Sequence, residues 1–357
     1  MSNGVEAPLK WSLLQPSLLF PSIGQVVTSD TQMTAPLRIW YNMNYPAPAT
    51  ELLKKSVAPH QLIFARSLQS SNLDAGAPDP QLAEADVAFG QPNPDALLNL
   101  PRLKWVHLTS AGYERYDRAD LRAAFTARGT ILTNSSSVYD EPCAEHALAM
   151  MMALARRLPD AWERQRTDHA WPTAAIRANC HLLVGQTALI LGYGAIARRL
   201  IELLTPMRMK LMAIRRKPTG NETVPTYAEA EIDRYLPEAD HVVNVLPGGS
   251  STTNFINAHR LSLMRPIAIL YNIGRGSTVD QDALLAALRE NRIAGAYLDV
   301  TQREPLPADH PLWTAPNCYI TPHTAGGHHD EFERLMQHFL EDLRRFTSNQ
   351  PLLDRVI

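Results

Sequence analysis

The stretch TALILGYGAIARRLIELL (187–204) decides the fold of this chain. Its first five residues predict a buried strand, which runs into Gly192 and Gly194 and then, with Ala197 as the third small residue, into an amphipathic helix. Glycines in such a turn permit the tight bend and let the backbone approach a pyrophosphate, which then lies on the helix N-terminus. The spacing GxGxxA between a strand and a helix therefore predicts a dinucleotide-binding unit.

The end of the next predicted strand, KLMAIR (210–215), bears on which dinucleotide binds. An NAD site places Asp or Glu there to accept hydrogen bonds from the ribose hydroxyls, whereas this chain has Arg215, Arg216 and Lys217. Cations at this position attract the 2′-phosphate of NADP. We therefore expect NADP as the cofactor, with NAD as the alternative; a solvated basic turn is the plain structural explanation of the same residues.

Short apolar segments alternate with helical patterns on both sides of this motif. The predicted strands are 37–42, 60–65, 85–90, 103–108, 130–134, 187–192, 210–215, 241–247, 267–272, 294–300 and 318–322. Residues 50–56 and 94–100 look helical. This alternation predicts an α/β fold with two doubly wound parallel sheets, each covered by helices on both faces.

Three further segments have a different pattern. EPCAEHALAMMMALARRL (141–158) predicts a long helix with Pro142 in its first turn and arginines at its end, and we expect it to link two domains. Residues 159–183, with Trp171, lack clear periodicity, so we expect an arm or loop on the surface that meets a partner subunit. Residues 328–346 predict an amphipathic helix.

The composition is that of a globular protein. A hydrophobic share of 45% and a charged share of 20% argue against disorder, and a net charge of -2 argues against nucleic acid or membrane partners. Three scattered cysteines without CxxC spacing suit a reducing cytoplasm. We expect residues 1–35 to be an extension outside the fold, with Met33 as an alternative start, because the apolar stretch 11–24 is interrupted by prolines and too short to span a bilayer.

Three polar motifs each follow a predicted strand in the second half of the chain. They are NIGRGSTVD (272–280), LDVTQREPLP (298–307) and TPHTAGG (321–327). In doubly wound folds, residues just beyond the carboxyl ends of the strands line the ligand crevice. Arg275, Glu304 and His323 are therefore placed to meet.

With these motifs in this order and spacing, residues 37–345 resemble the D-isomer-specific 2-hydroxyacid dehydrogenase family. The resemblance implies that Arg275 binds the substrate carboxylate and helps to polarise its carbonyl, and that His323, paired with Glu304, is the acid/base. Reduction of a 2-oxo acid develops negative charge on the carbonyl oxygen, so a proton donor must lie within hydrogen-bond reach of it. A neighbouring carboxylate orients an imidazole and favours its protonated form.

The resemblance also implies binding residues. Asp299 would hydrogen-bond the nicotinamide carboxamide, unless it only caps a strand end. The other implied cofactor contacts are Gly192, Gly194, Ala195, Ile196, Arg215, Arg216, Leu246, Pro247, Ile273, Gly274 and Ala325. The implied substrate contacts are Ser110, Ala111 and Gly112, through backbone N–H groups, together with Arg275. The family usually has Val and Asp where this chain has Tyr113 and Glu114, and this departure bears on the substrate.

The same resemblance implies a domain organisation and a partner. Residues 36–140 plus 325–357 would form a flavodoxin-like substrate domain, and residues 141–324 a Rossmann dinucleotide-binding domain. A homodimer is implied, in which Trp171 either enters the neighbouring subunit's site or packs at the interface.

We expect an NADPH-preferring reductase of a small 2-oxo acid, of the glyoxylate or hydroxypyruvate type. Formate oxidation on the same fold is disfavoured, because the family then has Gln at the position of Glu304. A dinucleotide-sensing binding protein, like the corepressors that share this architecture, stays open, since such proteins keep the three residues but turn over little substrate. The pair His328 and His329 lacks a neighbouring carboxylate set, so we expect a polar helix start and no metal site.

Overall fold

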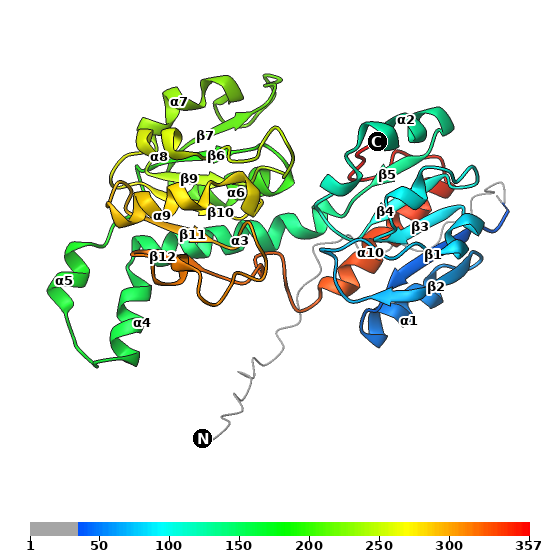
Figure 1. Ribbon diagram of the computed structural model, residues 1–357, viewed down its shortest axis with the longest axis horizontal. Coiled ribbons are helices and arrows are strands. Elements are labelled where there is room, and N and C mark those ends of the chain that lie inside the picture. The colour runs from blue at the N-terminus through cyan, green and yellow to red at the C-terminus, as the bar shows by residue number, and fades with distance from the viewer. Residues whose placement is uncertain (1–34) are drawn as a thin grey trace. The chain divides into compact units, whose positions relative to one another are not determined.

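Two parallel β-sheets organise the part of the chain that the computed structural model describes, residues 35–357 (Figure 1). The first sheet has the strand order β2-β1-β3-β4-β5, and the second has the order β12-β11-β10-β9-β6-β7-β8. All pairs of neighbouring strands are parallel. The first order is that of flavodoxin-like folds, and the second is the Rossmann order with one strand added. The predicted fold class is confirmed, whereas residues 1–34 of the predicted extension lie outside the described residues.

The first sheet carries helices on both faces. Its strands are β1 (Arg38–Met43), β2 (Gln61–Gln69), β3 (Val87–Gly90), β4 (Trp105–Leu108) and β5 (Ile131–Thr133). Because side chains alternate along a strand, Ile39 and Tyr41 pack with α1 (Ala47–Ser56) and α10 (Glu331–Thr347), whereas Trp40 packs with α2 (Ala119–Arg128). The last helix of the chain therefore returns to the first sheet.

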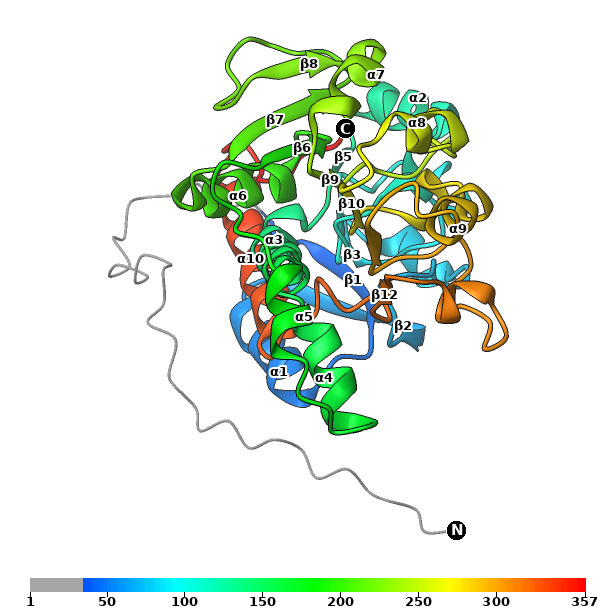
Figure 2. The ribbon, with the colours of Figure 1, turned by 90° about the vertical axis from the view of Figure 1, so that its left-hand side faces the viewer.

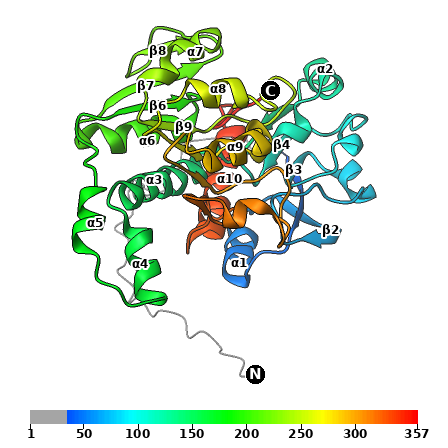
Figure 3. The same ribbon diagram turned by 60° about the vertical axis from the view of Figure 1, so that its left-hand side comes forward.

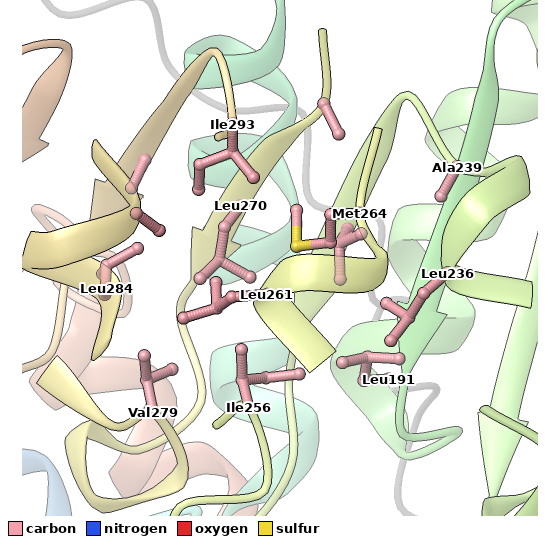
Figure 4. Packing of buried hydrophobic residues seen from close by; sticks show 14 of the residues in the cluster. Leu191, Leu236, Ala239, Ile256, Leu261, Met264, Leu270, Val279, Leu284 and Ile293 are labelled. Atoms are coloured by element: carbon pink, nitrogen blue, oxygen red, sulfur yellow. The ribbon is translucent and has the colours of Figure 1, made fainter. Parts of the chain in front are cut away.

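The second sheet is covered in the same way. Its strands are β6 (Thr187–Leu191), β7 (Lys210–Arg215), β8 (Thr226–Ala228), β9 (His241–Asn244), β10 (Ile269–Asn272), β11 (Gly295–Leu298) and β12 (Cys318–Ile320). One face packs on α3 (Ser136–Ala155) and α6 (Ala195–Leu204), which lie side by side in Figure 2. The other face packs on α7 (Ile232–Tyr235), α8 (Ala258–Leu263) and α9 (Gln281–Arg289) through the apolar cluster of Figure 4.

The parallel arrangement brings the predicted functional segments to one edge of the second sheet. The loops after β6, β9, β10, β11 and β12 all leave from the carboxyl ends of their strands. They carry Gly192, Leu246, Arg275, Glu304 and His323 respectively. In open α/β sheets, ligands bind at this edge.

The long helix α3 begins earlier than the sequence predicts. It starts at Ser136 instead of Glu141, so Pro142 lies in the helix interior and the expectation that it occupies the first turn is wrong. A proline there lacks the N–H that would bond to the carbonyl of Val138, which weakens the helix. Burial of Ala147 and Met151 against the second sheet compensates, and no local signal in the sequence reveals that packing.

Of two other predicted segments, one lies on the surface as expected and the other differs from the structure. The predicted arm, 159–183, contains two short helices, α4 (Leu158–Arg166) and α5 (Thr173–Ala178), which Figure 3 shows beyond the end of α3. Neither helix has a buried residue, and Trp171 between them is 91% exposed. Residues 94–100, predicted to be helical, form only a short 3-10 turn. Segments this short show too few turns for periodicity to decide between helix and loop. Between residues 35 and 357, no helix is both long and apolar enough to cross a bilayer.

A buried polar chain lies between the first sheet and α10. The indole N–H of Trp105 donates to the hydroxyl of Thr133 at 2.9 Å. His107 Nε2 faces the hydroxyl of Ser135 at 3.3 Å. The hydroxyl of Ser135 donates to the carbonyl of Leu108 at 2.8 Å, so Nε2 of His107 must carry the proton that faces it. The Thr133 hydroxyl donates to Nδ1 at 2.8 Å. Burial lowers the pKa of His107 to about 4, so the ring is neutral, with its proton on Nε2 and a lone pair on Nδ1.

Asp342 of α10 lies beside the ring of His107. Its Oδ1 accepts the backbone N–H of Leu353 at 2.8 Å, which ties the C-terminal segment to the helix. Its Oδ2 lies 3.6 Å from Nδ1 of His107 and is fully buried, with no hydrogen-bond donor among the described residues. Within the described part of the chain, Asp342 therefore has one buried oxygen without a hydrogen-bond donor, an arrangement that weakens the fold.

Candidate active site

The imidazole of His323 and the carboxylate of Glu304 form a tight pair. Nδ1 of His323, in the loop after β12, lies 2.6 Å from Oε2 of Glu304, in the loop after β11. The other oxygen, Oε1, accepts the backbone N–H of Thr301 at 3.0 Å. Burial raises the pKa of Glu304, but the hydrogen bonds from His323 and Thr301 outweigh it, and the pKa is lowered overall. Glu304 is therefore ionised, and Nδ1 of His323 carries a proton that it donates to the carboxylate. The other ring nitrogen, Nε2, stays available to a substrate.

Asp299 holds the loop that carries His323. Its buried carboxylate accepts the hydroxyl of Thr321 at 2.6 Å and the backbone N–H groups of Thr324 at 2.9 Å and Ala325 at 3.0 Å. His323 itself has a φ of 53°, a left-handed conformation that costs energy for a non-glycine residue. The loop can hold this conformation because its backbone is pinned on both sides. The structure thus shows Asp299 as a strand-end anchor, and its predicted contact with nicotinamide stays a prediction.

Arg275 follows β10 and is held from several directions. Its Nη1 donates to the carbonyl of Gly274 at 2.8 Å, and its Nε lies 3.0 Å from Oε1 of Glu114. A Cβ on Gly112 would lie only 1.8 Å from Nη2 of Arg275, so the guanidinium rests directly against this glycine. Gly112 belongs to residues 110–112, the predicted substrate contacts, which we call the predicted substrate loop. The side chain is 34% exposed, which leaves part of the guanidinium open to a ligand.

The loop of Arg275 also contacts the loop of Glu304. A Cβ on Gly276 would lie 1.9 Å from the carbonyl of Thr301, so the two backbones touch. The charge of Arg275 also contributes to the lowered pKa of Glu304. The structure therefore brings Arg275, Glu304 and His323 to one region of the carboxyl edge, on three separate loops.

Hydrogen bonds to oxygen atoms of the predicted substrate loop hold it in place. The Ser110 hydroxyl donates to the carbonyl of Gly112 at 2.7 Å and accepts the side-chain N–H of Gln91 at 3.0 Å. The side chain of Asn134 donates to the carbonyl of Ala111 at 2.7 Å. Within the described residues, the backbone N–H groups of Ala111 and Gly112 have no acceptor. These are the groups that could bind an anion beside Arg275.

The glycine turn after β6 fits a pyrophosphate. Gly192 has a φ of 109°, a conformation that favours glycine, and a Cβ there would press on Val245 at 3.2 Å. Gly194 precedes α6, and a Cβ there would meet nothing within 4 Å, so the space above the helix N-terminus is open. Ala195 and Ile196 begin α6, where the first backbone N–H groups have no partner within the helix. This cradle suits the dianionic group of a dinucleotide.

The other predicted cofactor residues lie in the loops after β9, β10 and β12. They are Leu246, Pro247, Ile273, Gly274 and Ala325. A Cβ on Gly274 would lie 2.6 Å from the carbonyl of Leu246, so the loops after β9 and β10 touch. Leu246, Ile273 and Ala325 are buried, so they can offer a ligand mainly backbone and the edges of small apolar groups.

Arg215 has a partner that the sequence does not reveal. Its Nη1 lies 2.6 Å from Oε1 of Glu222, in the segment between β7 and β8. Arg216 and Lys217 are exposed, and neither makes an ion pair within residues 35–357. Glu114, likewise, is visible in the sequence only as a departure from the family pattern, and its ion pair with Arg275 requires the folded chain. Neither contact has a local sequence signal.

Comparison with known proteins gives a consistent result. The model of the "D-isomer specific 2-hydroxyacid dehydrogenase, NAD binding domain" matches residues 148–325. The chain is 34% identical over 259 residues to a glyoxylate reductase of Korarchaeum cryptofilum (strain OPF8), covering 70% of this chain and 75% of that protein. It is also 34% identical over 266 residues to glyoxylate/hydroxypyruvate reductase B of Pectobacterium carotovorum subsp. carotovorum (strain PC1), covering 70% and 79%.

Solved structures extend the similarity to both sheets. A D-isomer specific 2-hydroxyacid dehydrogenase family protein from Aeromonas salmonicida subsp. salmonicida A449 is 28% identical, with a TM-score of 0.69 over 90% of this chain and 99% of that one. A D-isomer specific 2-hydroxyacid dehydrogenase from Xanthobacter autotrophicus Py2, solved with NADPH and MES, is 24% identical, with a TM-score of 0.75 over 90% and 98%. At 24% identity, the similarity to this second structure shows only that the fold is shared.

Proposed function

This chain belongs to the D-isomer specific 2-hydroxyacid dehydrogenase family, and we propose that it reduces a small 2-oxo acid, such as glyoxylate or hydroxypyruvate, with NADPH preferred over NADH. It is an oxidoreductase of the NAD(P)-dependent class. The observation that carries the proposal is the 2.6 Å pair of His323 and Glu304 on the loops next to Arg275. A proton donor and a carboxylate-binding cation are the two groups that 2-oxo acid reduction requires.

Arg275 binds and orients the substrate in this proposal. Its partly exposed guanidinium meets the substrate carboxylate, and the free N–H groups of Ala111 and Gly112 complete the anion site. Glu114 holds Nε of the guanidinium, so the remaining donors keep one orientation. A fixed substrate carboxylate in turn fixes the adjacent carbonyl group, which is the reacting group.

His323 donates the proton. Nε2 of the imidazolium gives a proton to the carbonyl oxygen as negative charge develops there, and Glu304 stabilises the positive ring through Nδ1. In the oxidative direction the same nitrogen accepts the hydroxyl proton. Asp299 acts through the loop, because its carboxylate pins the backbone on both sides of His323.

The cofactor is assigned to the second sheet. When bound, a nicotinamide dinucleotide supplies the hydride that reduces the carbonyl carbon. Gly192, Gly194 and the first N–H groups of α6 would hold its pyrophosphate, and Arg215 with Arg216 would meet the 2′-phosphate of NADP. The family's NAD binding domain covers this same region of the chain.

The organisation around the site is part of the proposal. We assign substrate binding to a domain of residues 36–140 plus 325–357, and dinucleotide binding to residues 141–324. The exposed Trp171 and the helices that flank it support a homodimer in which this segment meets the partner subunit. A cytoplasmic location agrees with the three free cysteines of the chain.

Steady-state assays of a panel of 2-oxo acids with NADPH and with NADH test the proposal. We expect turnover of glyoxylate or hydroxypyruvate, with a higher kcat/KM for NADPH than for NADH. A protein that binds dinucleotide but does not measurably reduce any 2-oxo acid would be a sensor of the corepressor kind, and the proposed activity would be refuted.

A further inference from the structure

The segment between β7 and β8 is fastened to the glycine turn. The hydroxyl of Tyr193, which lies between Gly192 and Gly194, accepts the backbone N–H of Thr223 at 2.7 Å and bonds to its hydroxyl at 3.0 Å. The guanidinium of Arg215 lies 5.7 Å from the centre of the same Tyr193 ring. The carboxylate of Glu222, one residue before Thr223, is therefore held at the edge of the pyrophosphate cradle.

The carboxylate of Glu222 is bonded by four donors. Oε1 accepts the backbone N–H of Thr219 at 2.8 Å, the Thr219 hydroxyl at 2.9 Å and Nη1 of Arg215 at 2.6 Å, and Oε2 accepts the backbone N–H of Gly220 at 2.8 Å. The side chain is only 4% exposed. These bonds, led by the one from the Thr219 N–H, lower the pKa of Glu222 to about 2. The carboxylate is therefore charged at neutral pH, and it neutralises Arg215.

We propose that Glu222 weakens the discrimination between NADP and NAD by occupying, on Arg215, the position that the 2′-phosphate would take. The proposal rests on the dinucleotide-dependent function above and deepens it. Arg215 ends β7, the strand whose end contacts the adenosine ribose in this type of fold. An internal carboxylate on its Nη1 is an anion at the site where a second anion, the phosphate, would bind.

The charge of Glu222 therefore weakens the binding of NADP and strengthens the binding of NAD. The phosphate of NADP must compete with Glu222 for Arg215 and is repelled by its charge. The 2′-hydroxyl of NAD carries no charge, and it can donate a hydrogen bond to the same carboxylate, which is the role that an acidic residue has in NAD sites. Glu222 thus supplies, from a later loop, the acidic group that is missing at the strand end. The exposed Arg216 and Lys217 still favour the phosphate, so the wild-type protein uses both cofactors.

Direct binding measurements on the full-length protein test this inference without turnover. The change is Glu222→Gln, which keeps the shape of the side chain and removes its charge. Dissociation constants for NADPH, NADH, adenosine 2′,5′-bisphosphate and AMP are measured by calorimetry or by fluorescence titration. We expect the ratio Kd(NADH)/Kd(NADPH) to rise about tenfold, with a parallel rise in Kd(AMP)/Kd(adenosine 2′,5′-bisphosphate).

Two further variants control the experiment. Glu229→Gln removes the same charge from the neighbouring segment, where no bond to Arg215 exists, and should leave both ratios unchanged. In an Arg215→Gln background, Glu222→Gln should change the ratios far less than in the wild type, because the ion pair is already absent. A general electrostatic effect would appear in all three variants.

The outcomes separate the inference from the proposed function. If both ratios of dissociation constants are unchanged or lower in Glu222→Gln, while the protein still reduces 2-oxo acids, only the inference is overturned. Glu222 would then serve only to hold its own loop. Failure of the wild-type protein to bind any dinucleotide would overturn the proposed function and the inference together.

Discussion

Gly112 lies where the predicted substrate loop touches Arg275, which makes it the most informative single position in the site. The change Gly112→Ala adds one carbon atom. Gly112 does not have the left-handed backbone that only glycine tolerates well, so alanine fits the backbone. The added Cβ would lie 1.8 Å from Nη2 of Arg275, 2.9 Å from Oε2 of Glu114 and 3.0 Å from Cζ of Arg275. The perturbation therefore acts on the guanidinium and its partner and not on the fold of the loop.

The size of the effect follows from that contact. Ordinary van der Waals contact begins at 3.4 Å, so the guanidinium must retreat by about 1.6 Å or rotate away from Glu114. A misplacement of about 1 Å in a substrate-positioning group can lower the rate about 100-fold. We therefore expect kcat/KM for the 2-oxo acid to fall at least about 100-fold, or about 2.7 kcal/mol of transition-state stabilisation.

The assay measures kcat/KM for the 2-oxo acid together with the Kd for NADPH. The Kd should not change, because Gly112 belongs to the substrate loop and not to the dinucleotide cradle. Gly327→Ala is the matched control: Gly327 also lacks a left-handed backbone, and the atom nearest to its added Cβ would be 3.5 Å away. If Gly112→Ala keeps kcat/KM within about threefold of the wild type, Arg275 is not where the substrate carboxylate binds.

Three further changes probe other parts of the molecule. Glu304→Gln replaces the carboxylate that lies 2.6 Å from Nδ1 of His323 by a neutral amide, so kcat should fall at least about tenfold while the Kd for NADPH stays unchanged; an unchanged kcat would remove Glu304 from its role beside His323. The pKa of Glu304 is lowered, so in a pH–rate profile of the wild type the protonation of this carboxyl should cause no loss of rate within or above the ordinary glutamate range; such a loss would contradict the lowered pKa. Asp342→Asn replaces the buried Oδ2, which has no donor among residues 35–357 and lies 3.6 Å from Nδ1 of His107, by an N–H group that this nitrogen attracts, so the melting temperature should rise by about 2 °C; a lower melting temperature would contradict this placement of the carboxyl group. Trp171→Ser should shift a dimer toward monomer in light scattering, and an unchanged mass would exclude Trp171 from the interface.

Strong local patterns made the fold predictable from the sequence. The strand, turn and helix around Gly192 follow from five apolar residues, two glycines and an amphipathic stretch, all within one short segment. The buried strands of parallel sheets are nearly continuous apolar runs, so the sequence predicts which segments are strands. The observed ends of these strands differ from the predicted ends by a few residues. The short edge strand β8 (Thr226–Ala228) was missed, because none of its residues is fully buried.

Features that depend on tertiary packing could not be predicted from the local sequence. Pro142 suggests a helix start by its local preference, but α3 already begins at Ser136, because its later turns pack against the second sheet and α6. The predicted arm around Trp171 contains helices too short for periodicity to show. For α3, the deciding contacts join residues far apart in the sequence.

The same distinction applies to the site. Arg275, Glu304 and His323 each follow a strand in a recognisable motif, and their strands are parallel neighbours, so their gathering at one edge was predictable. Glu114 and Glu222 lie in segments without such a motif, and their ion pairs with the two functional arginines became visible only in the folded chain. The roles of all these residues remain predictions that the experiments above address.

The most direct test compares wild-type protein with His323→Ala in the reduction of glyoxylate and hydroxypyruvate by NADPH. Loss of a positioned proton donor should lower kcat at least about 100-fold, while the Kd for NADPH and the melting temperature stay close to those of the wild type. If His323→Ala turns over either 2-oxo acid at the wild-type rate, the imidazole is not the acid of this reaction, and the account of the site is wrong.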